Sequence, residues 1–302
     1  MSLDFKGRVA IVTGAGGGLG REHALALAAR GAKVVVNDLG GAVDGSGGST
    51  SAAQAVVNEI RAAGGEAIAN GASVTDFAAV EAMVRQAVDT WGRVDVLVNN
   101  AGILRDKSFA KMDMADFRLV IDVHVMGAVH CTKAVWALMQ QQKYGRIVMT
   151  TSSTGLYGNF GQSNYGAAKM ALVGLMQTLA LEGEKYGIRV NCLAPTAATR
   201  MTQDIFPGDM LDRFGPEAVV PAMLVLASDD APTRTILCAG AGTFEAANVT
   251  LTAGRHIGIG PNVPERLALE LPAVRDRAGE TVPGSGAAQS MNEMQLARAA
   301  RG

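Results

Sequence analysis

Cysteine is scarce in this chain of 302 residues, which has three in all. Cys131, Cys192 and Cys238 are odd in number and far apart, so they predict neither a disulfide framework nor a metal site. We expect them to pack as small apolar side chains. A reducing compartment, the cytoplasm, fits this pattern best.

The chain also has no excess of basic over acidic residues, with 27 Lys and Arg against 28 Asp and Glu. The formal net charge is −1, so no basic field is available to hold a nucleic-acid backbone. No stretch reaches the roughly 18 uninterrupted apolar residues of a membrane span. The first eight residues carry charge where a secretory signal needs an apolar run, and the last residues are not a Ser-Lys-Leu peroxisomal address. We therefore expect no nucleic-acid partner, no membrane and a cytoplasmic location.

Hydrophobic residues make up 48% of the chain, enough for one substantial core. Short β-branched runs alternate with alanine-rich helical patterns, and runs such as 34–36 and 94–98 are nearly continuous in apolar character. Such strands are buried on both faces, which predicts an α/β fold: a Rossmann-type doubly wound parallel sheet of about seven strands with helices on both faces. Expected strands cover 9–12, 33–36, 67–70, 94–98, 146–150, 189–193 and 235–238, and expected helices cover 19–29, 52–63, 77–91, 114–141, 164–185 and 217–227.

Three stretches interrupt the alternation. Residues 40–51 form a loop rich in Gly and Ser that is unusually long for an α/β unit, and residues 194–215 form a second long connection. Beyond residue 254 the pattern dissolves into Gly-, Pro- and Ala-rich sequence with a final helical stretch at 291–300. We expect a main domain over 1–254 and an irregular extension over 255–302, either an interface or partly disordered.

A glycine-rich turn, Thr-Gly-Ala-Gly-Gly-Gly-Leu-Gly at 13–20, joins the first expected strand to the first expected helix. Glycines at such a turn let backbone amides approach a pyrophosphate, and the helix N-terminus favours negative charge. A P-loop is excluded because Gly20 is followed by Arg21-Glu22 and not by Lys-Ser or Lys-Thr. The turn therefore predicts a dinucleotide site, with a purely structural turn as the alternative.

Asp38 ends the second expected strand, 20 residues after Gly18 (38 − 18). A carboxylate there accepts hydrogen bonds from a ribose 2′-hydroxyl and repels a 2′-phosphate. No Lys or Arg lies within 37–41. NAD is therefore predicted over NADP, with simple capping of a turn as the alternative role of Asp38.

Ser152, Tyr165 and Lys169 set a hydroxyl, a phenol and an ammonium at offsets of 13 (165 − 152) and 4 (169 − 165). An offset of four places Tyr165 and Lys169 on one helix face. A neighbouring ammonium favours the phenolate, so we expect it to lower the pKa of Tyr165 from its usual ~10. Tyr165 could then exchange a proton with a carbonyl oxygen that Ser152 holds. The alternative is that Tyr165 and Lys169 are an exposed pair on a helix with no catalytic role.

Taken together, these features resemble the short-chain dehydrogenase/reductase family over roughly residues 5–240. The matching pieces are Thr13-Gly14-x-x-x-Gly18-x-Gly20, Asn99-Asn100-Ala101-Gly102, Ser152 and Tyr165-x-x-x-Lys169. The resemblance implies Tyr165 as general acid/base, Lys169 on the nicotinamide ribose and Ser152 on the substrate oxygen. It implies a cofactor site made of Gly14, Gly18, Leu19, Gly20, Asp38, Ser73, Val74, Asn100, Ala101, Gly102, Tyr165, Lys169, Pro195 and Thr199.

Two positions depart from the family pattern. His124 stands where the family usually has its fourth catalytic residue, an Asn, and it either carries a proton-relay water or simply packs. Pro195-Thr196 stands where Pro-Gly is usual, and Thr199 is expected to contact the cofactor carboxamide. Ser73 also replaces an Asp that many family members carry.

A narrower likeness is to the dehydrogenase units of peroxisomal multifunctional enzymes, carried by segments 36–41, 102–109, 143–153, 157–162 and 200–203. That branch also tends to carry His at the position of His124. It implies that hydride passes between NAD(H) and a substrate that alternates between a (3R)-hydroxyacyl-CoA and its 3-ketoacyl-CoA.

The alternatives are a 17β-hydroxysteroid dehydrogenase and a 3-oxoacyl-carrier-protein reductase, although the latter prefers NADP. A non-catalytic NAD-binding relative and a nucleotide-sugar epimerase fit less well, because Tyr165 and Lys169 are both present and no large substrate domain follows.

The expected partners are therefore a small-molecule substrate, an acyl-CoA thioester or a steroid, and further copies of the chain. Met and Phe residues in 194–215 suit an adaptable apolar wall or a short packing helix. The helices expected at 114–141 and 164–185 usually pair between subunits in this family, which implies a homodimer or homotetramer.

Overall fold

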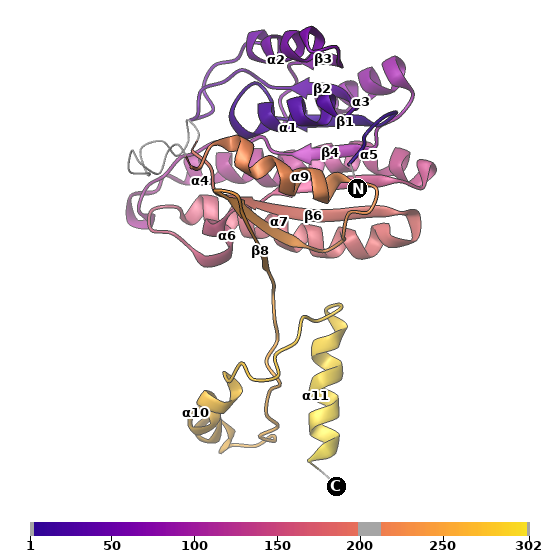
Figure 1. The fold of residues 1–302 in the computed structure, drawn as a ribbon. Coiled ribbons are helices and arrows are strands. Elements are labelled where there is room, and N and C mark those ends of the chain that lie inside the picture. Colours follow the sequence, from indigo (N-terminus) through magenta and orange to yellow (C-terminus); the bar gives the residue numbers. More distant parts are fainter. Residues whose placement is uncertain (1–2, 199–212, 301–302) are drawn as a thin grey trace. The chain divides into compact units, whose positions relative to one another are not determined.

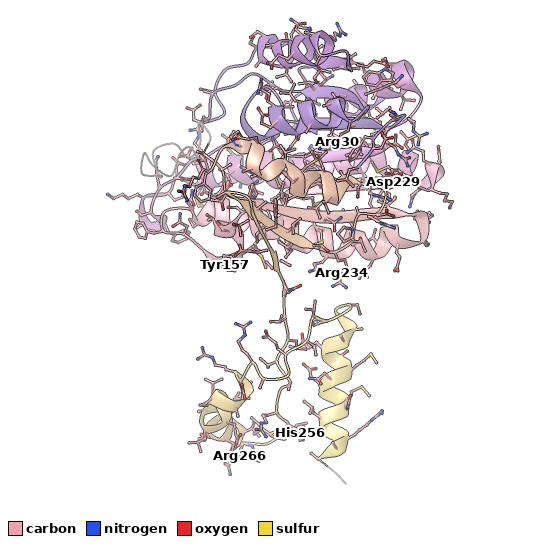
Figure 2. The ribbon with its side chains drawn as sticks, viewed as in Figure 1. Arg30, Tyr157, Asp229, Arg234, His256 and Arg266 are labelled. Carbon is pink, nitrogen blue, oxygen red and sulfur yellow. The ribbon has the colours of Figure 1, made fainter. Side chains whose placement is uncertain are left out.

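The computed structural model describes residues 3–198 and 213–300. Its chain divides into two compact units, Met1–Ala246 and Ala247–Gly302. The first unit holds an eight-stranded sheet in the order β3-β2-β1-β4-β5-β6-β7-β8 (Figure 1). The strands are β1 (Val9–Thr13), β2 (Lys33–Asn37), β3 (Glu66–Asn70), β4 (Val96–Asn99), β5 (Gly145–Thr150), β6 (Ile188–Pro195), β7 (Ile236–Gly240) and β8 (Thr243–Ala247).

The central strands are buried along their whole length. Every residue of β1, β4 and β5 is buried, as the continuous apolar runs predicted. The pairs from β3 across to β7 are parallel, with Ile11 of β1 in register with Val35 of β2 and Leu97 of β4. Strand order reverses between β1 and β4, and in such sheets ligands bind in the crevice at the carboxyl ends of the strands beside this point.

The eighth strand exceeds the predicted number of about seven. A two-residue connection, Ala241-Gly242, joins β7 to β8, and both residues have positive φ, 49° and 74°. So short a link can join only antiparallel strands, because a parallel crossover needs a dozen or more residues. The first four residues of β8 are exposed, so this strand carries no apolar signal in the sequence.

Helices pack in layers against the sheet (Figure 1). On one side α1 contacts both α2 and α9, and elsewhere α3 contacts α5 and α4 contacts α7. Their bounds are α1 (Gly18–Ala29), α2 (Ser51–Ala62), α3 (Phe77–Trp91), α4 (Met114–Ile121), α5 (Gly127–Gln142), α6 (Ser153–Tyr157), α7 (Ser163–Gly183) and α9 (Val220–Ala227), with short 3₁₀ turns η1 (Phe109–Lys111), η3 (Glu184–Tyr186) and η4 (Pro216–Val219).

The long helix expected over 114–141 is interrupted, which corrects that prediction. Between α4 and α5 the chain forms a π-helical turn, η2 (Asp122–Met126), centred on His124. The π turn adds one residue within a stretch that stays helical on both sides, and the sequence pattern did not reveal it. Such turns occur frequently at functional sites.

The second unit contains two helices, α10 (Val263–Val274) and α11 (Ala287–Ala299), neither with a buried residue (Figure 1). A single antiparallel bridge pairs Leu251 with Thr281 through two hydrogen bonds of 2.9 Å. The sequence predicted the helix near the end but not α10. Pro264 and Pro272 argued against a helix there, yet Pro is tolerated in a first turn, and Pro272 lies near the helix end.

The buried histidine of α1 predicts acid sensitivity. His23 is fully buried, and within the described residues neither ring nitrogen has a hydrogen-bond partner. Burial lowers its pKa to about 4 from 6.5, so below pH 6.5 the unfolded chain binds the extra proton first. We expect the free energy of unfolding to fall by about 1.4 kcal/mol per pH unit from this group between pH 6.5 and 4. Urea unfolding of His23→Leu at pH 7, 6 and 5 should show a flatter pH dependence; an unchanged slope contradicts the assignment.

Candidate active site

A cavity of about 230 Å³ lies at the carboxyl ends of β1, β2 and β4, where the strand order reverses. This volume and place suit part of a dinucleotide. Nine residues of the predicted cofactor site line the cavity: Gly14, Gly18, Leu19, Asp38, Ser73, Val74, Asn100, Ala101 and Gly102.

The glycine turn leaves no room for side chains. A Cβ on Gly20 would lie 2.2 Å from the carbonyl oxygen of Gly14, and one on Gly14 would lie 2.8 Å from Cα of Ala101. Gly14 and Gly18 also have positive φ, 62° and 51°. The turn is therefore held open to a ligand by backbone alone, as a bound pyrophosphate at the N-terminus of α1 requires.

Asp38 lies beside the glycine turn, directly after β2. Its Oδ2 accepts a hydrogen bond of 2.7 Å from the amide of Gly16, and its Oδ1 accepts one of 2.6 Å from the amide of Gly40. These two bonds hold the carboxylate at the wall of the cavity. The residues therefore fit the adenosine half of a nicotinamide dinucleotide, with a negative charge where the ribose would lie.

Asn100 joins two strand ends beneath the cavity. Its Nδ2 donates to the carbonyl oxygens of Thr13 and Gly14 at 3.0 and 3.1 Å. The Thr13 hydroxyl in turn accepts from the amides of Asn100 and Ala101 at 3.0 and 3.1 Å. This network fixes the glycine turn against the end of β4. Thr13 belongs to the glycine motif, but the sequence alone did not indicate that it supports the site.

The loop over 40–51 supplies part of the cavity wall, which the sequence did not predict. Gly41, Ala42, Val43 and Gly45 line the cavity together with Ile103. The loop is pinned where Leu104 donates to the carbonyl of Val43 at 3.1 Å and Arg105 donates to that of Asp44 at 2.7 Å. Its length was the available signal, because long loops inside a compact unit are usually functional.

Ser152 and Tyr165 come from two helices that pack together, α6 and α7. Ser152 caps α6 by accepting a hydrogen bond of 3.2 Å from the amide of Thr154. The Ser152 side chain lies near enough to the phenol of Tyr165 to lower its pKa. The structure thus brings the predicted hydroxyl and phenol together.

Lys169 is buried one turn after Tyr165. Its Nζ donates to the carbonyl oxygen of Thr150 at 2.6 Å and lies 5.4 Å from the centre of the Tyr165 ring. Burial of the ammonium lowers the pKa of Lys169 to about 7. Lys169 is therefore buried and Tyr165 partly buried, so the predicted pair is not surface decoration.

The pKa of Tyr165 shifts in the direction opposite to the one expected. Burial raises it to about 12, the hydrogen bond with Ser152 lowers it, and the Asp106 carboxylate raises it. Desolvation is the largest effect here, because burial disfavours the charged form of the phenol. The expectation that Lys169 by itself brings the phenol toward neutral pH is therefore wrong for this state of the chain.

His124 lies against Tyr165 with its ring edge-on, 5.3 Å between ring centres and at 90°. Its Nε2 contacts the backbone of Ile103, at 2.9 Å from the carbonyl oxygen and 3.1 Å from the amide. Burial, with a contribution from Lys169, lowers the pKa of His124 to about 3, so the ring is neutral at pH 7. Nδ1 is buried and has no hydrogen-bond partner among the described residues.

A second, smaller cavity of about 10 Å³ separates His124 from Lys169. Asn99 also lines it, and Oδ1 of Asn99 is another buried atom without a partner in the described part of the chain. A polar cavity of this volume is near the minimum that holds one water molecule. The arrangement can therefore place one water between the imidazole and the ammonium.

Other predicted residues fall elsewhere. Gly20 and Pro195 do not line the larger cavity, and Pro195 ends β6. Thr199 and the apolar residues 201–211 of the expected substrate wall lie outside the described residues. Two basic side chains that follow β4, Arg105 and Lys107, both pair with Asp116, at 3.1 and 3.4 Å. No cluster of three or more metal-ligating side chains occurs within 3–198 and 213–300, and no described helix is long and apolar enough to cross a bilayer.

Comparison with known proteins gives consistent matches. The family model described as short chain dehydrogenase matches residues 8–209. A yeast protein (Saccharomyces cerevisiae) named peroxisomal hydratase-dehydrogenase-epimerase is 53% identical over 244 residues, 80% of this chain; the chain covers 27% of that protein's length.

Two solved structures extend the comparison. A short chain dehydrogenase from Mycobacterium avium superposes with a TM-score of 0.76 at 42% identity, covering 92% of this chain and 97% of the other. A 7α-hydroxysteroid dehydrogenase complexed with NADH and 7-oxo glycochenodeoxycholic acid superposes at 0.72 with 33% identity, covering 79% of this chain and 95% of the other.

Proposed function

This chain belongs to the short chain dehydrogenase family, and from that premise we propose that it transfers hydride between NAD(H) and a (3R)-hydroxyacyl-CoA or its 3-ketoacyl-CoA. It is an oxidoreductase that acts on a CH–OH group with a nicotinamide cofactor. The observation that carries the proposal is the meeting of Ser152, Tyr165 and Lys169. Tyr165 packs against His124, whose ring contacts Ile103 in the wall of the larger cavity.

The proton-transfer step follows from the positions of the side chains. When bound, the nicotinamide accepts or returns a hydride at C4. In the oxidation, Tyr165 as phenolate takes the hydroxyl proton of the substrate while the carbon loses hydride. Ser152, whose hydroxyl lies beside the phenol of Tyr165, holds the substrate oxygen as its charge develops. In the reduction, the same phenol returns the proton.

We propose Lys169 as the group that orients the nicotinamide ribose, with Asp38 on the adenosine ribose. The carboxylate of Asp38, held by two backbone amides, would repel a 2′-phosphate, which supports NAD over NADP. The cofactor contacts proposed for Pro195 and Thr199 remain predictions. An oxidised nicotinamide held by these residues would supply a positive charge that favours the phenolate of Tyr165 and opposes the effect of burial on its pKa.

Two further proposals concern the chain as a whole. A homodimer or homotetramer built on α5 and α7 is supported by exposed apolar residues, Met126 directly before α5 and Met170 and Leu181 in α7. The cytoplasmic location expected from the sequence remains a prediction, because the yeast relative is named as peroxisomal. The division into an NAD-binding domain over 1–254 and an extension over 255–302 likewise remains a proposal.

His124 is proposed to hold a relay water through Nδ1, in line with the small cavity that it shares with Lys169. His124→Leu removes that polar atom and keeps an apolar packing group, so we expect kcat to fall about 10-fold or more, as loss of a proton-transfer path does. His124→Asn, the residue usual in the family, should retain more activity than the leucine variant. Equal kcat in the leucine variant and the wild type, measured at pH 7 with saturating substrate, contradicts the relay.

The substrate is tested by following NADH absorbance with purified enzyme. The panel contains (3R)-hydroxyacyl-CoA thioesters of several chain lengths, their (3S) epimers as matched controls, 17β-hydroxysteroids and simple secondary alcohols. We expect the (3R)-thioesters to give the highest kcat/KM. Absence of turnover with every (3R)-thioester contradicts the substrate proposal, and a preference for NADP contradicts the role of Asp38.

A further inference from the structure

Gln162 is a buried amide, 8% exposed, that precedes α7 and lies three residues before Tyr165 (165 − 162). Its side chain binds three separate segments. Oε1 accepts hydrogen bonds from Thr154 Oγ1 and Asn159 Nδ2, both at 3.0 Å. Nε2 donates to Oδ2 of Asp106 at 2.6 Å. Gln162 thus connects the start of α7 with α6, with the loop between them and with the segment that follows β4.

The contact with Thr154 leads directly to the substrate-oxygen site. The amide of Thr154 donates to the hydroxyl of Ser152, and the Thr154 hydroxyl donates to Gln162. One side chain therefore holds the helix capped by Ser152 against the first turn of the helix that carries Tyr165. The distance between the reacting hydroxyl and phenol depends on this connection.

The contact with Asp106 anchors the connection from the other side. The bond is short because its acceptor is a carboxylate, and such charge-assisted bonds are stronger than neutral ones. The backbone on either side of Asp106 also bonds to the start of α7 and to the loop before it. The carbonyl of Arg105 accepts from Asn164 Nδ2 at 2.9 Å, and the amide of Lys107 donates to the carbonyl of Gly161 at 2.9 Å.

We propose that Gln162 and Asp106 form a positioning pair that sets Ser152 and Tyr165 at reacting distance. Neither residue touches the reacting atoms in this role; each acts through α6 and α7. A displacement of about 1 Å at a catalytic group can cost on the order of 10²-fold in rate. The inference rests on the proposed roles of Ser152 and Tyr165, and not on the identity of the substrate.

The Asp106 carboxylate also acts on Tyr165 through its charge, because it raises the pKa of the phenol. The other groups around the phenol are the Lys169 ammonium, 5.4 Å from the ring centre, and the neutral His124 ring. Asp106 therefore favours the protonated phenol, the form that donates to a ketone in the reductive direction.

A swap of acid and amide tests the pair. Gln162→Glu places a second carboxylate against Asp106 and removes the donor between them. In the double variant Asp106→Asn/Gln162→Glu, all three partners of the new carboxylate can donate: the new asparagine amide, Thr154 and Asn159. The single variant should therefore lose activity and the double variant should recover it. Asp106→Asn alone keeps an acceptor for Gln162 and removes only the charge.

The assay uses full-length enzyme and reduction of ethyl acetoacetate, a 3-oxo ester without CoA, alongside 3-ketoacyl-CoA. We expect kcat of Gln162→Glu to fall about 10-fold or more and that of the double variant to return within about threefold of wild type. NADH affinity, followed by the fluorescence of the two tryptophans, should change little.

The proposal is overturned if Gln162→Glu keeps the kcat of the wild type, or if a folded double variant does not recover activity. Where Gln162→Glu does not fold, Gln162→Asn, too short to reach all three partners, takes its place.

A titration without substrate provides an independent readout. Alkaline absorbance of the wild type minus Tyr165→Phe isolates the phenol of Tyr165, and the same difference is recorded in the Asp106→Asn background. Loss of the charge should lower the pKa of Tyr165. The surface variant Asp89→Asn serves as a control. An unshifted titration overturns the role of Asp106, whereas lack of acyl-CoA turnover with normal reduction of ethyl acetoacetate overturns only the proposed substrate.

Discussion

Tyr165→Phe is expected to lower kcat by roughly 10²- to 10⁴-fold, the contribution typical of a positioned general acid or base. The phenylalanine keeps the ring against His124 and removes only the hydroxyl beside Ser152. NADH binding should therefore survive, because the larger cavity is lined by other residues. Initial rates in both directions and NADH affinity by fluorescence measure the two effects.

The pH dependence identifies the role of the phenol. Oxidation needs the phenolate, so its rate in the wild type should rise with pH up to the pKa of Tyr165 in the cofactor complex. Reduction needs the phenol and should fall over the same range. Both dependences should disappear in Tyr165→Phe. Tyr186→Phe, in η3, is the matched control and should behave as wild type. Retained oxidation with its pH dependence intact in Tyr165→Phe contradicts the mechanism.

Lys169→Met is expected to cost on the order of 10²-fold in kcat for oxidation and to move its pH dependence to higher pH. Methionine fills a similar volume but leaves Tyr165 without a nearby cation. The phenol is already disfavoured as phenolate by burial, which raises its pKa to about 12. Rates measured between pH 6 and 11 show the displacement. Lys185→Met, a change of an exposed lysine, is the control.

Lys169→Met should lower activity without lowering the free energy of unfolding, so the two measurements separate a chemical role of Lys169 from a structural one. The pKa of Lys169 is about 7 in the folded chain and near 10.4 when unfolded, so the folded chain binds fewer protons between these values. Its burial therefore destabilises the fold progressively as pH falls from about 10 toward 7, by roughly 1.4 kcal/mol per unit. Lys169→Met removes that cost, so its unfolding free energy at pH 7 should be equal or higher. A large loss of stability together with activity would point to a structural role.

Local sequence predicted the elements that carry the site. The bounds of α3 were predicted correctly at 77–91. Seven of the eight strands begin and end within two residues of the expected runs. The glycine turn and Asp38 were expected beside one another, and Asp38 does bond to Gly16 within that turn. These features are local because they depend on periodicity, on glycine and on offsets along a single helix.

Features that depend on distant contacts were not predicted. The side chain of Gln162 forms hydrogen bonds with Asp106, Thr154 and Asn159. The spacing of these residues along the chain does not predict that they come together. The π-helical turn at His124 lies inside a stretch that is helical on both sides, and β8 has too few buried residues to be recognised. The loop over 40–51 was noticed for its length, but only its contacts with Ile103 and Arg105 place it on the cavity.

The amino-acid sequence by itself determined that this protein has a parallel sheet, a glycine turn followed by an acid, and a hydroxyl, a phenol and an ammonium at fixed offsets. Only the tertiary structure decided how those groups behave. Burial raises the pKa of Tyr165 and lowers those of Lys169 and His124, which reverses the expectation drawn from Lys169 alone. The physical reason is that desolvation depends on everything packed around a group, whereas sequence spacing reports only its nearest neighbours along the helix.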